Sequence, residues 1–230
     1  MNTPAFDSLA SDYETQLSQG LSVSGESKDF FARGRIGYLR RAWDRRQGRP
    51  EPGRVIDFGC GVGDVTPILA EVFPRAQVLG LDPSSRCVER ARSRFASDRI
   101  SFATIADAPA GTSADLVHLN GVIHHVAPAD RPGVFASLAS LVAPGGMVAL
   151  FENNPWNPGT RLVMSRIPFD KDAVTIAAPD VRRHLRDVGL RPAETRFLFY
   201  FPRALSALRF LEPFLARLPL GAQYGVLSEK

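Results

Sequence analysis

The fold is decided by the stretch Val55-Ile56-Asp57-Phe58-Gly59-Cys60-Gly61-Val62-Gly63-Asp64. The apolar run Val55–Phe58 is typical of a short buried strand, and Val65–Phe73 has the apolar spacing of a helix. The three glycines between them permit positive φ angles and a close approach of the backbone to a ligand. A helix that starts after such a loop presents free N–H groups. The stretch therefore predicts a strand–loop–helix unit that binds a ligand.

Outward from this loop, strand and helix patterns alternate along the chain. We expect strands at Gln77–Leu81, Ile100–Ile105, Asp115–Leu119 and Met147–Phe151, with helices at Ser84–Phe95 and Arg131–Leu141. Such alternation predicts βαβ units and a parallel sheet.

Two flanking parts complete a single domain. Residues 1–46 are an N-terminal helical arm whose helix is expected over 28–46, and 47–152 form the ligand-binding core. Residues 153–230 form a C-terminal part that caps the site and binds substrate. It begins with the polar loop Asn153–Gly159 and continues with a helix at Pro179–Val188 and strands at Arg196–Phe201 and Gln223–Leu227, which are expected to pair antiparallel at one sheet edge.

Composition excludes several classes of protein. The chain has 230 residues, of which 44% are hydrophobic and 23% charged, which is ordinary globular usage. A net charge of +4 is too mild to indicate a nucleic-acid partner. Cys60 and Cys87 are the only cysteines and form no metal-ligand cluster, so we expect no metal and no disulfide framework. The polar start and the lack of a long apolar run lead us to expect a cytoplasmic protein.

Carboxylates follow three successive strands. They are Asp57, Asp82 and Asp107. The carboxyl ends of parallel strands are where open α/β sheets bind ligands, and an acid after the second strand can accept both ribose hydroxyls. Asp57 favours a ligand with a positive charge. Asp64 would lie close to a pyrophosphate, which argues against a nicotinamide-dependent oxidoreductase.

Four motifs, DFGCGVGD, LGLDPS, ATIADA and LVAPGG, resemble in order and spacing those of class I S-adenosylmethionine-dependent methyltransferases, most closely the UbiE-like small-molecule enzymes. The resemblance covers residues 50–152. It implies a Rossmann-like α/β fold, a seven-stranded sheet with helices on both faces and its last strand antiparallel. It also implies S-adenosylmethionine as cofactor and S-adenosylhomocysteine as product.

Carried over by position, the resemblance assigns cofactor contacts. The loop residues Asp57, Gly59, Cys60 and Gly61 would hold the methionine part, with Asp57 toward its amino group. Asp82 and Pro83 would take the ribose, while Asp107 would take the adenine amine with Ala106 and Ala108 against the ring. Asn120 and Gly121 would line the sulfonium side, and Tyr13 of the N-terminal arm would close over the site.

Candidate catalytic residues follow the fourth and fifth strands. His125, and after it His124, is a candidate general base, because histidine titrates near neutrality. Glu152 is a second candidate base or an orienting group. Asn154, Asn157 and Arg161 could bind a polar acceptor. The alternatives are that the histidines pack or cap a helix and that the asparagines cap their own turn.

The predicted function is transfer of a methyl group to a small molecule, with oxygen favoured over nitrogen as the acceptor atom. The apolar, arginine-containing stretch Phe197–Leu220 is expected mainly to pack on the sheet. It could instead cover a hydrophobic or aromatic acceptor or lie on a membrane surface. Two alternative functions stay open. The protein could use the same cofactor for chemistry other than methyl transfer, or it could methylate lipid-like acceptors at a membrane surface.

Overall fold

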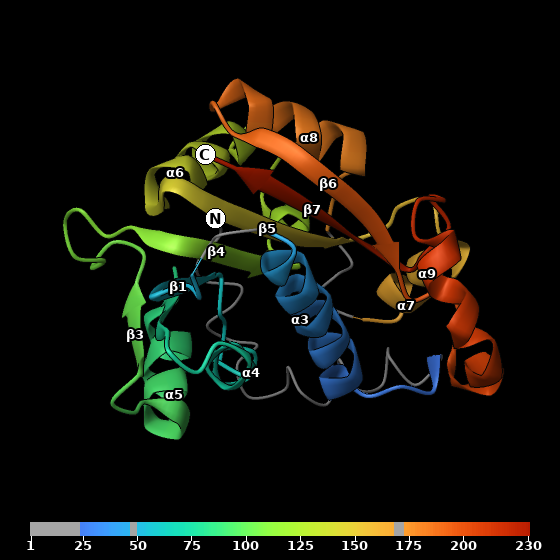
Figure 1. Ribbon diagram of the computed structural model, residues 1–230, viewed down its shortest axis with the longest axis horizontal. Helices are drawn as coiled ribbons and strands as arrows, with labels where there is room; N and C mark the ends of the chain where they lie inside the picture. Colours follow the sequence, from blue (N-terminus) through green and yellow to red (C-terminus); the bar gives the residue numbers. More distant parts are fainter. Residues whose placement is uncertain (1–23, 47–49, 168–172) are drawn as a thin grey trace.

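The computed structural model describes residues 24–46, 50–167 and 173–230 and contains a seven-stranded sheet in the order β3-β2-β1-β4-β5-β7-β6 (Figure 1). The strands are β1 (Arg54–Phe58), β2 (Gln77–Asp82), β3 (Ile100–Thr104), β4 (Ala114–Asn120), β5 (Val142–Asn153), β6 (Arg191–Leu198) and β7 (Gln223–Glu229). β1 to β5 pair in parallel, whereas β7 runs antiparallel to both β5 and β6. The predicted Rossmann-like sheet with an antiparallel last strand is confirmed.

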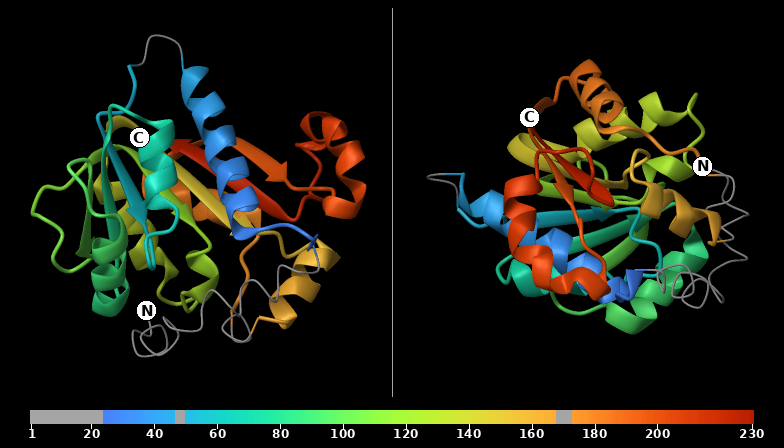
Figure 2. Two further views of the ribbon diagram at one scale, coloured as in Figure 1. Left: turned by 90° about the horizontal axis from the view of Figure 1, so that it is seen from below. Right: turned by 90° about the vertical axis from the view of Figure 1, so that its right-hand side faces the viewer.

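Helices cover both faces of the sheet (Figures 1 and 2). One face carries α3 (Lys28–Asp44), α4 (Thr66–Val72) and α5 (Ser85–Phe95), and the other carries α6 (Arg131–Leu141) and α8 (Ala178–Asp187). Alternate residues of β5 serve the two sides. Val148 and Leu150 belong to the α6/α8 core, and Ala149 and Phe151 to the α3/α4 core. Because this part of β5 is buried on both faces, Met147–Phe151 is a continuous apolar run.

Helix α3 is fixed by a cap and by one apolar face. The Ser27 hydroxyl accepts a hydrogen bond from the Phe30 N–H at 3.1 Å, as an N-cap should. Ile36 and Leu39 are completely buried against the sheet. Each such side chain contributes roughly 1.5–3 kcal/mol to the free energy of folding. Arg35 lies next to this apolar face and is itself buried, so its guanidinium is held inside the molecule.

Three elements after β5 differ from expectation. The segment predicted as a loop leads into α7 (Pro158–Ser165), where the Asn157 side chain caps the helix and Pro158 occupies its first turn. β6 begins at Arg191, whereas the sequence pattern predicts a start at Arg196. The pattern gives too late a start because the first half of β6 lies at the sheet edge and is polar. The arginine-studded stretch Arg203–Leu218, whose pattern predicts a helix, instead forms a 3₁₀ helix, η4 (Arg203–Leu211), followed by the short α9 (Glu212–Leu215).

Neither η4 nor α9 buries a residue. The expectation that Phe197–Leu220 mainly packs on the sheet is therefore wrong for these two elements, although Phe197 and Ala216 are buried. No helix within the described ranges is long and apolar enough to cross a membrane. Tyr13 lies outside the described residues.

Candidate active site

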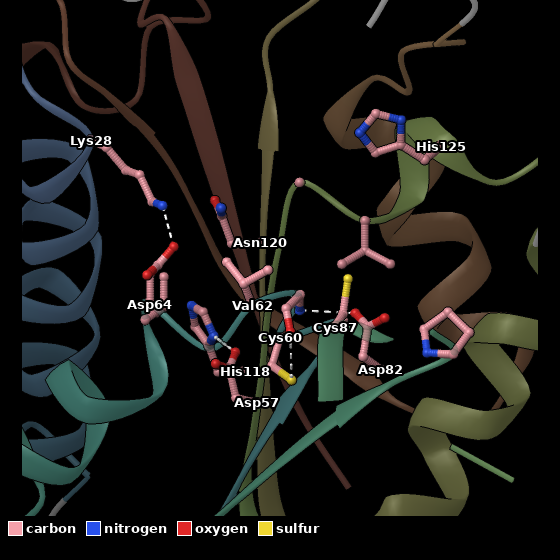
Figure 3. Close-up of a pocket in the computed structure, with 16 residues that line it drawn as sticks. Lys28, Asp57, Cys60, Val62, Asp64, Asp82, Cys87, His118, Asn120 and His125 are labelled. Atoms are coloured by element: carbon pink, nitrogen blue, oxygen red, sulfur yellow. Dashed lines mark hydrogen bonds and ion pairs between the residues drawn. The ribbon is translucent and has the colours of Figure 1, made fainter. Parts of the chain in front are cut away.

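The glycine loop after β1 forms the floor of a first cavity of about 150 Å³ at the carboxyl ends of β1, β2 and β4 (Figure 3). Gly59, Gly61 and Gly63 all have positive φ angles, of 72°, 55° and 85°. A Cβ on Gly59 would lie 2.4 Å from Val122, whereas one on Gly61 would meet no atom within 4 Å. The loop therefore needs glycine for its conformation, and at Gly61 it leaves open space beside the backbone.

Asp82 and Asp57 line this cavity from neighbouring strands (Figure 3). The Asp82 carboxylate accepts hydrogen bonds from the Gly61 N–H at 2.8 Å and from the Ser84 N–H at 2.9 Å. Asp57 accepts from the Thr66 hydroxyl at 2.7 Å, and its other oxygen lies 2.9 Å from His118 Nδ1. Both carboxylates are thus held rigidly beside the glycine loop, where they can accept hydrogen bonds from an ammonium group and from ribose hydroxyls.

Two residues that sequence reasoning missed also line the first cavity. His118 on β4 stands opposite Asp57 in the strand register and is 1% exposed. Lys28 reaches the cavity from α3 and forms an ion pair with Asp64, which also pairs with Arg94 at 3.2 Å (Figure 3). The Asp64 carboxylate therefore holds the positively charged side chains of Lys28 and Arg94 beside the loop.

The expected adenine contacts lie apart from these residues. Asp107 is exposed, and its carboxylate accepts a hydrogen bond from the Thr104 hydroxyl at 2.6 Å. Neither Asp107 nor its neighbours Ala106 and Ala108 lines the first cavity. Their role stays a prediction from the resemblance. By contrast, Pro83, Cys60, Asn120 and Gly121 are all in the cavity wall, and their contact with the cofactor also stays a prediction.

A second cavity, of about 490 Å³, adjoins the first. The two share a common wall made of Lys28, Val65, Asn120, Gly121 and His125. Apolar side chains from distant segments supply much of the remaining wall, namely Phe30, Phe31, Val163, Met164, Ile167 and Phe199. Two adjoining cavities with His125 at their junction give the arrangement that a transfer between two bound molecules requires.

His124 and His125 occupy the short 3₁₀ helix η2 (Ile123–His125) and are in ring contact, with centroids 4.1 Å apart. Glu152 fixes this turn from beneath. One of its oxygens accepts from the Ile123 N–H at 2.7 Å, and the other lies 2.6 Å from His124 Nδ1. Glu152 is 2% exposed and lies outside both cavity walls. It therefore holds the Ile123 N–H and the His124 ring from outside the two cavities.

The pKa of the Glu152 carboxyl reflects this position. Burial alone raises it, but the charge and hydrogen bond of His124, the Ile123 N–H and the charge of His125 more than compensate. The net pKa is lowered, so the carboxylate stays ionised inside the protein.

The second cavity also has a polar wall built from three elements. Arg35 Nη1 on α3 donates to Gln223 Oε1 on β7 at 2.8 Å, and Gln223 Nε2 donates to Asn153 Oδ1 on β5 at 3.2 Å. Arg35 is 5% exposed. It was not singled out from the sequence. Its spacing from Ala32, Leu39 and Trp43 was the available sign that it lies toward the buried side.

Of the substrate residues predicted after β5, one lines the second cavity and two do not. Asn157 lines the second cavity while it caps α7 and donates to the Leu220 carbonyl at 2.6 Å. Asn154 is 1% exposed, and its amide donates to the carbonyls of Pro219 and Gly221. Arg161 is exposed on α7. Asn154 and Arg161 both lie outside the cavity walls, because one is committed to a loop and the other points away.

The residues present fit S-adenosylmethionine. Asp57 and Asp82 supply acceptors for an ammonium group and for ribose hydroxyls, and the open space at Gly61 allows close approach to the backbone. Within the described residues no cluster of three or more metal-ligating side chains occurs.

Comparisons with known proteins agree with this fit. A family model described as a methyltransferase domain matches residues 56–148. A trans-aconitate 2-methyltransferase from Variovorax paradoxus is 33% identical over 202 residues, which cover 78% of this chain and 76% of that protein. One from Methylobacterium radiotolerans is 36% identical over 138 residues, covering 58% of this chain and 51% of that protein.

Solved structures share the fold. A SAM-dependent methyltransferase from Archaeoglobus fulgidus superposes with a TM-score of 0.64 at 15% identity and covers 89% of this chain and 95% of that chain. A Haemonchus contortus phosphoethanolamine N-methyltransferase 2 in complex with S-adenosyl-L-methionine has a TM-score of 0.57 at 18% identity, covering 84% and 52%. The chain belongs to the class I S-adenosylmethionine-dependent methyltransferases and transfers the methyl group of this cofactor to a small molecule.

Proposed function

We propose that this methyltransferase acts on a carboxylate oxygen of a small organic acid. The observation that carries the proposal is the polar wall of the second cavity, made by Arg35, Gln223 and Asn153. The second cavity is accordingly taken as the acceptor cavity, and the first as the cofactor cavity.

The hydrogen bonds of this wall run in one direction. Arg35 carries only donors, Gln223 uses its oxygen to accept from Arg35, and Asn153 uses its oxygen to accept from Gln223. The wall therefore presents N–H groups and a positive charge. An acceptor-only anion such as a carboxylate matches these groups, and Arg is suited to hold it in a two-point contact.

The protein needs to supply little acid–base catalysis for this reaction. When bound, S-adenosylmethionine supplies an electrophilic methyl group that forms a bond to the acceptor oxygen as its bond to sulfur breaks, with the electron pair left on S-adenosylhomocysteine. A carboxylate is already ionised at neutral pH and needs no base. His125 and Lys28, at the junction of the two cavities, would then position the acceptor as hydrogen-bond donors.

The relatives support oxygen as the acceptor atom. Trans-aconitate, which is part of their printed name, is a tricarboxylic acid that contains no nitrogen. The acceptor cavity of this chain adds an apolar wall from Phe30, Phe31 and Met164. This wall favours an acid whose carboxylate reaches Arg35 while an apolar body contacts these side chains.

The test is methyl transfer from radiolabelled S-adenosylmethionine to a panel of acids. The panel contains trans-aconitate, dicarboxylic acids and monocarboxylic acids of increasing chain length, with glycine and ethanolamine as amine controls. A methyl ester releases volatile methanol in alkali, whereas an N-methyl or ether product does not. We expect alkali-labile label with at least one acid. Label that resists alkali would refute an ester product.

Variants of one helix separate anchoring from folding. Arg35→Gln removes the charge and should lower kcat/KM for the acid about 10- to 100-fold, which corresponds to one charge-assisted hydrogen bond. Arg35→Lys should restore part of this loss. Arg41→Gln, an exposed position on the same helix, is the matched control. Equal kinetics for Arg35→Gln and Arg41→Gln, with cofactor affinity intact in both, would refute the carboxylate anchor.

A further inference from the structure

One end of the molecule exposes large apolar side chains. It is formed by α7, η4, α9 and the loop that follows α9, which face the viewer together in the right-hand view of Figure 2. Phe214 is 83% exposed and Phe210 68%. We call this the end face and define it by Trp156, Leu162, Phe210, Phe214, Leu218 and Leu220.

Hydrogen bonds join the elements of the end face into one surface. The loop after α9 is tied to the start of α7, since Asn157 donates to the Leu220 carbonyl and Asn154 donates to the Pro219 carbonyl. The Tyr200 hydroxyl lies 2.6 Å from the carbonyl oxygens of both Leu215 and Leu218, which share its single donor hydrogen. These hydrogen bonds therefore hold the backbone that carries the exposed apolar side chains in a fixed arrangement.

The end face carries an excess of positive charge. Four exposed arginines lie on its segments, which span 153–167 and 199–222, namely Arg161, Arg166, Arg203 and Arg217. The single acid of these two segments is Glu212, and one of its oxygens accepts from the backbone N–H groups of Tyr200 and Phe201. Exposed aromatic and leucine side chains interspersed with arginines are the composition of helices that lie at an anionic membrane interface.

We propose that the end face docks on an anionic lipid surface. Charge complementarity favours lipid over a second copy of the chain, because a symmetric dimer through this face would bring two sets of exposed arginines together. On a lipid surface the phenylalanines enter the headgroup region while the guanidinium groups meet phosphates.

The end face is continuous with the acceptor cavity. Pro158 and Gly159 of α7 line that cavity, and so do Phe201 and Pro202, which lead into η4. An apolar acceptor held in the lipid surface would thus be next to the wall through which it must pass. The docking itself does not depend on which acceptor is methylated.

The test is co-sedimentation of the full chain with vesicles of phosphatidylcholine alone and of phosphatidylcholine with phosphatidylglycerol. We expect binding only to the anionic vesicles, weakened by salt. The double variant Phe210→Ser/Phe214→Ser should lower the partition coefficient by roughly tenfold or more, and Arg203→Glu/Arg217→Glu should do the same. These side chains are exposed, so melting temperature and cofactor affinity should be unchanged in both.

Matched controls are exposed residues outside the segments that form the end face. Val174→Ser removes an exposed apolar side chain elsewhere, and Arg54→Glu reverses an exposed charge at the start of β1. Both should bind vesicles as the wild type does. Absence of binding to anionic vesicles, or binding that end-face and control variants weaken equally, would overturn the proposal. So would a dimer in light scattering that Phe214→Ser dissociates while vesicle binding is absent.

Discussion

Glu152→Gln is the substitution that best probes the turn carrying the two histidines. In the native protein the buried carboxylate holds the Ile123 N–H at 2.7 Å and His124 Nδ1 at 2.6 Å. Glutamine keeps the shape and removes the charge. Each hydrogen bond to a charged group contributes about 1.5–3 kcal/mol, against about 0.5–1.5 kcal/mol for a neutral one. Two such bonds predict a loss of about 2–3 kcal/mol in the free energy of unfolding.

For a chain of this length that loss corresponds to a melting temperature lower by about 4–12 °C. The assay is calorimetry together with urea denaturation at neutral pH. The control is Glu194→Gln on the edge strand β6, where a partly exposed carboxylate pairs with Arg45 and Arg196. A pair of that kind contributes only about 0–1 kcal/mol. Equal losses for the two variants would refute the reasoning.

The pH dependence gives a second check. The folded-state pKa of Glu152 lies below the ordinary glutamate value of 4.5, so its stabilising effect is complete above 4.5 and is lost as the pH falls through the lower, folded-state pKa. The gap between wild type and Glu152→Gln should therefore shrink as the pH falls below 4.5 through the folded-state pKa. A gap that widens in acid would show that the carboxylate is not held as described. Because Glu152 lies outside both cavity walls, cofactor affinity should be unchanged while kcat falls.

Four further outcomes concern the cofactor cavity and the glycine loop beneath it. Asp82→Ala should weaken S-adenosylmethionine binding in calorimetry by at least about tenfold. His125→Ala should lower kcat with a carboxylate acceptor by less than the 10²- to 10⁴-fold that loss of a general base causes. Gly63→Ala, which is strained and would clash, should cost about 1–3 kcal/mol in urea denaturation, and Gly111→Ala, with open space, should cost less. Burial and nearby carboxylates raise the pKa of the Cys60 thiol, so mass spectrometry should show slow alkylation until the protein unfolds.

The sequence predicts the core of the fold well because its signals there are local. The β1 loop needs glycines at three positive φ angles, and β1 and β2, which come before the loop and after α4, are short and mostly buried strands. β6 was placed five residues late because its first half, at the sheet edge, has polar residues such as Arg191 and Glu194. The start of α7 was marked by Asn157 and Pro158, a cap and first-turn signal that was interpreted as a loop.

The residues of the candidate site also fall into two groups, those that the sequence predicts and those that it does not. Asp57, Asp82 and Asn120 follow from their places at strand ends, since strand order alone brings those ends together. Arg35 and Gln223 do not follow, because their contact joins positions 188 residues apart and depends on α3 packing beside β7. His118 was missed because it sits within an apolar strand, and only the strand register shows that it stands opposite Asp57.

The two cavities are built from different parts of the chain. Among the residues that the structure describes, the cofactor cavity is lined by Lys28 and by one continuous run of the chain, residues 57–125. The acceptor cavity draws on segments 24–35, 153–167 and 199–223, and the two cavities meet in five shared residues. Substitutions in those outer segments can reshape the acceptor cavity without touching the glycine loop or its carboxylates. Because Arg35 reaches Gln223 only when β7 has closed against β5, the acceptor anchor forms only in the completed sheet. Acceptor selection and cofactor binding are therefore separable properties of this fold.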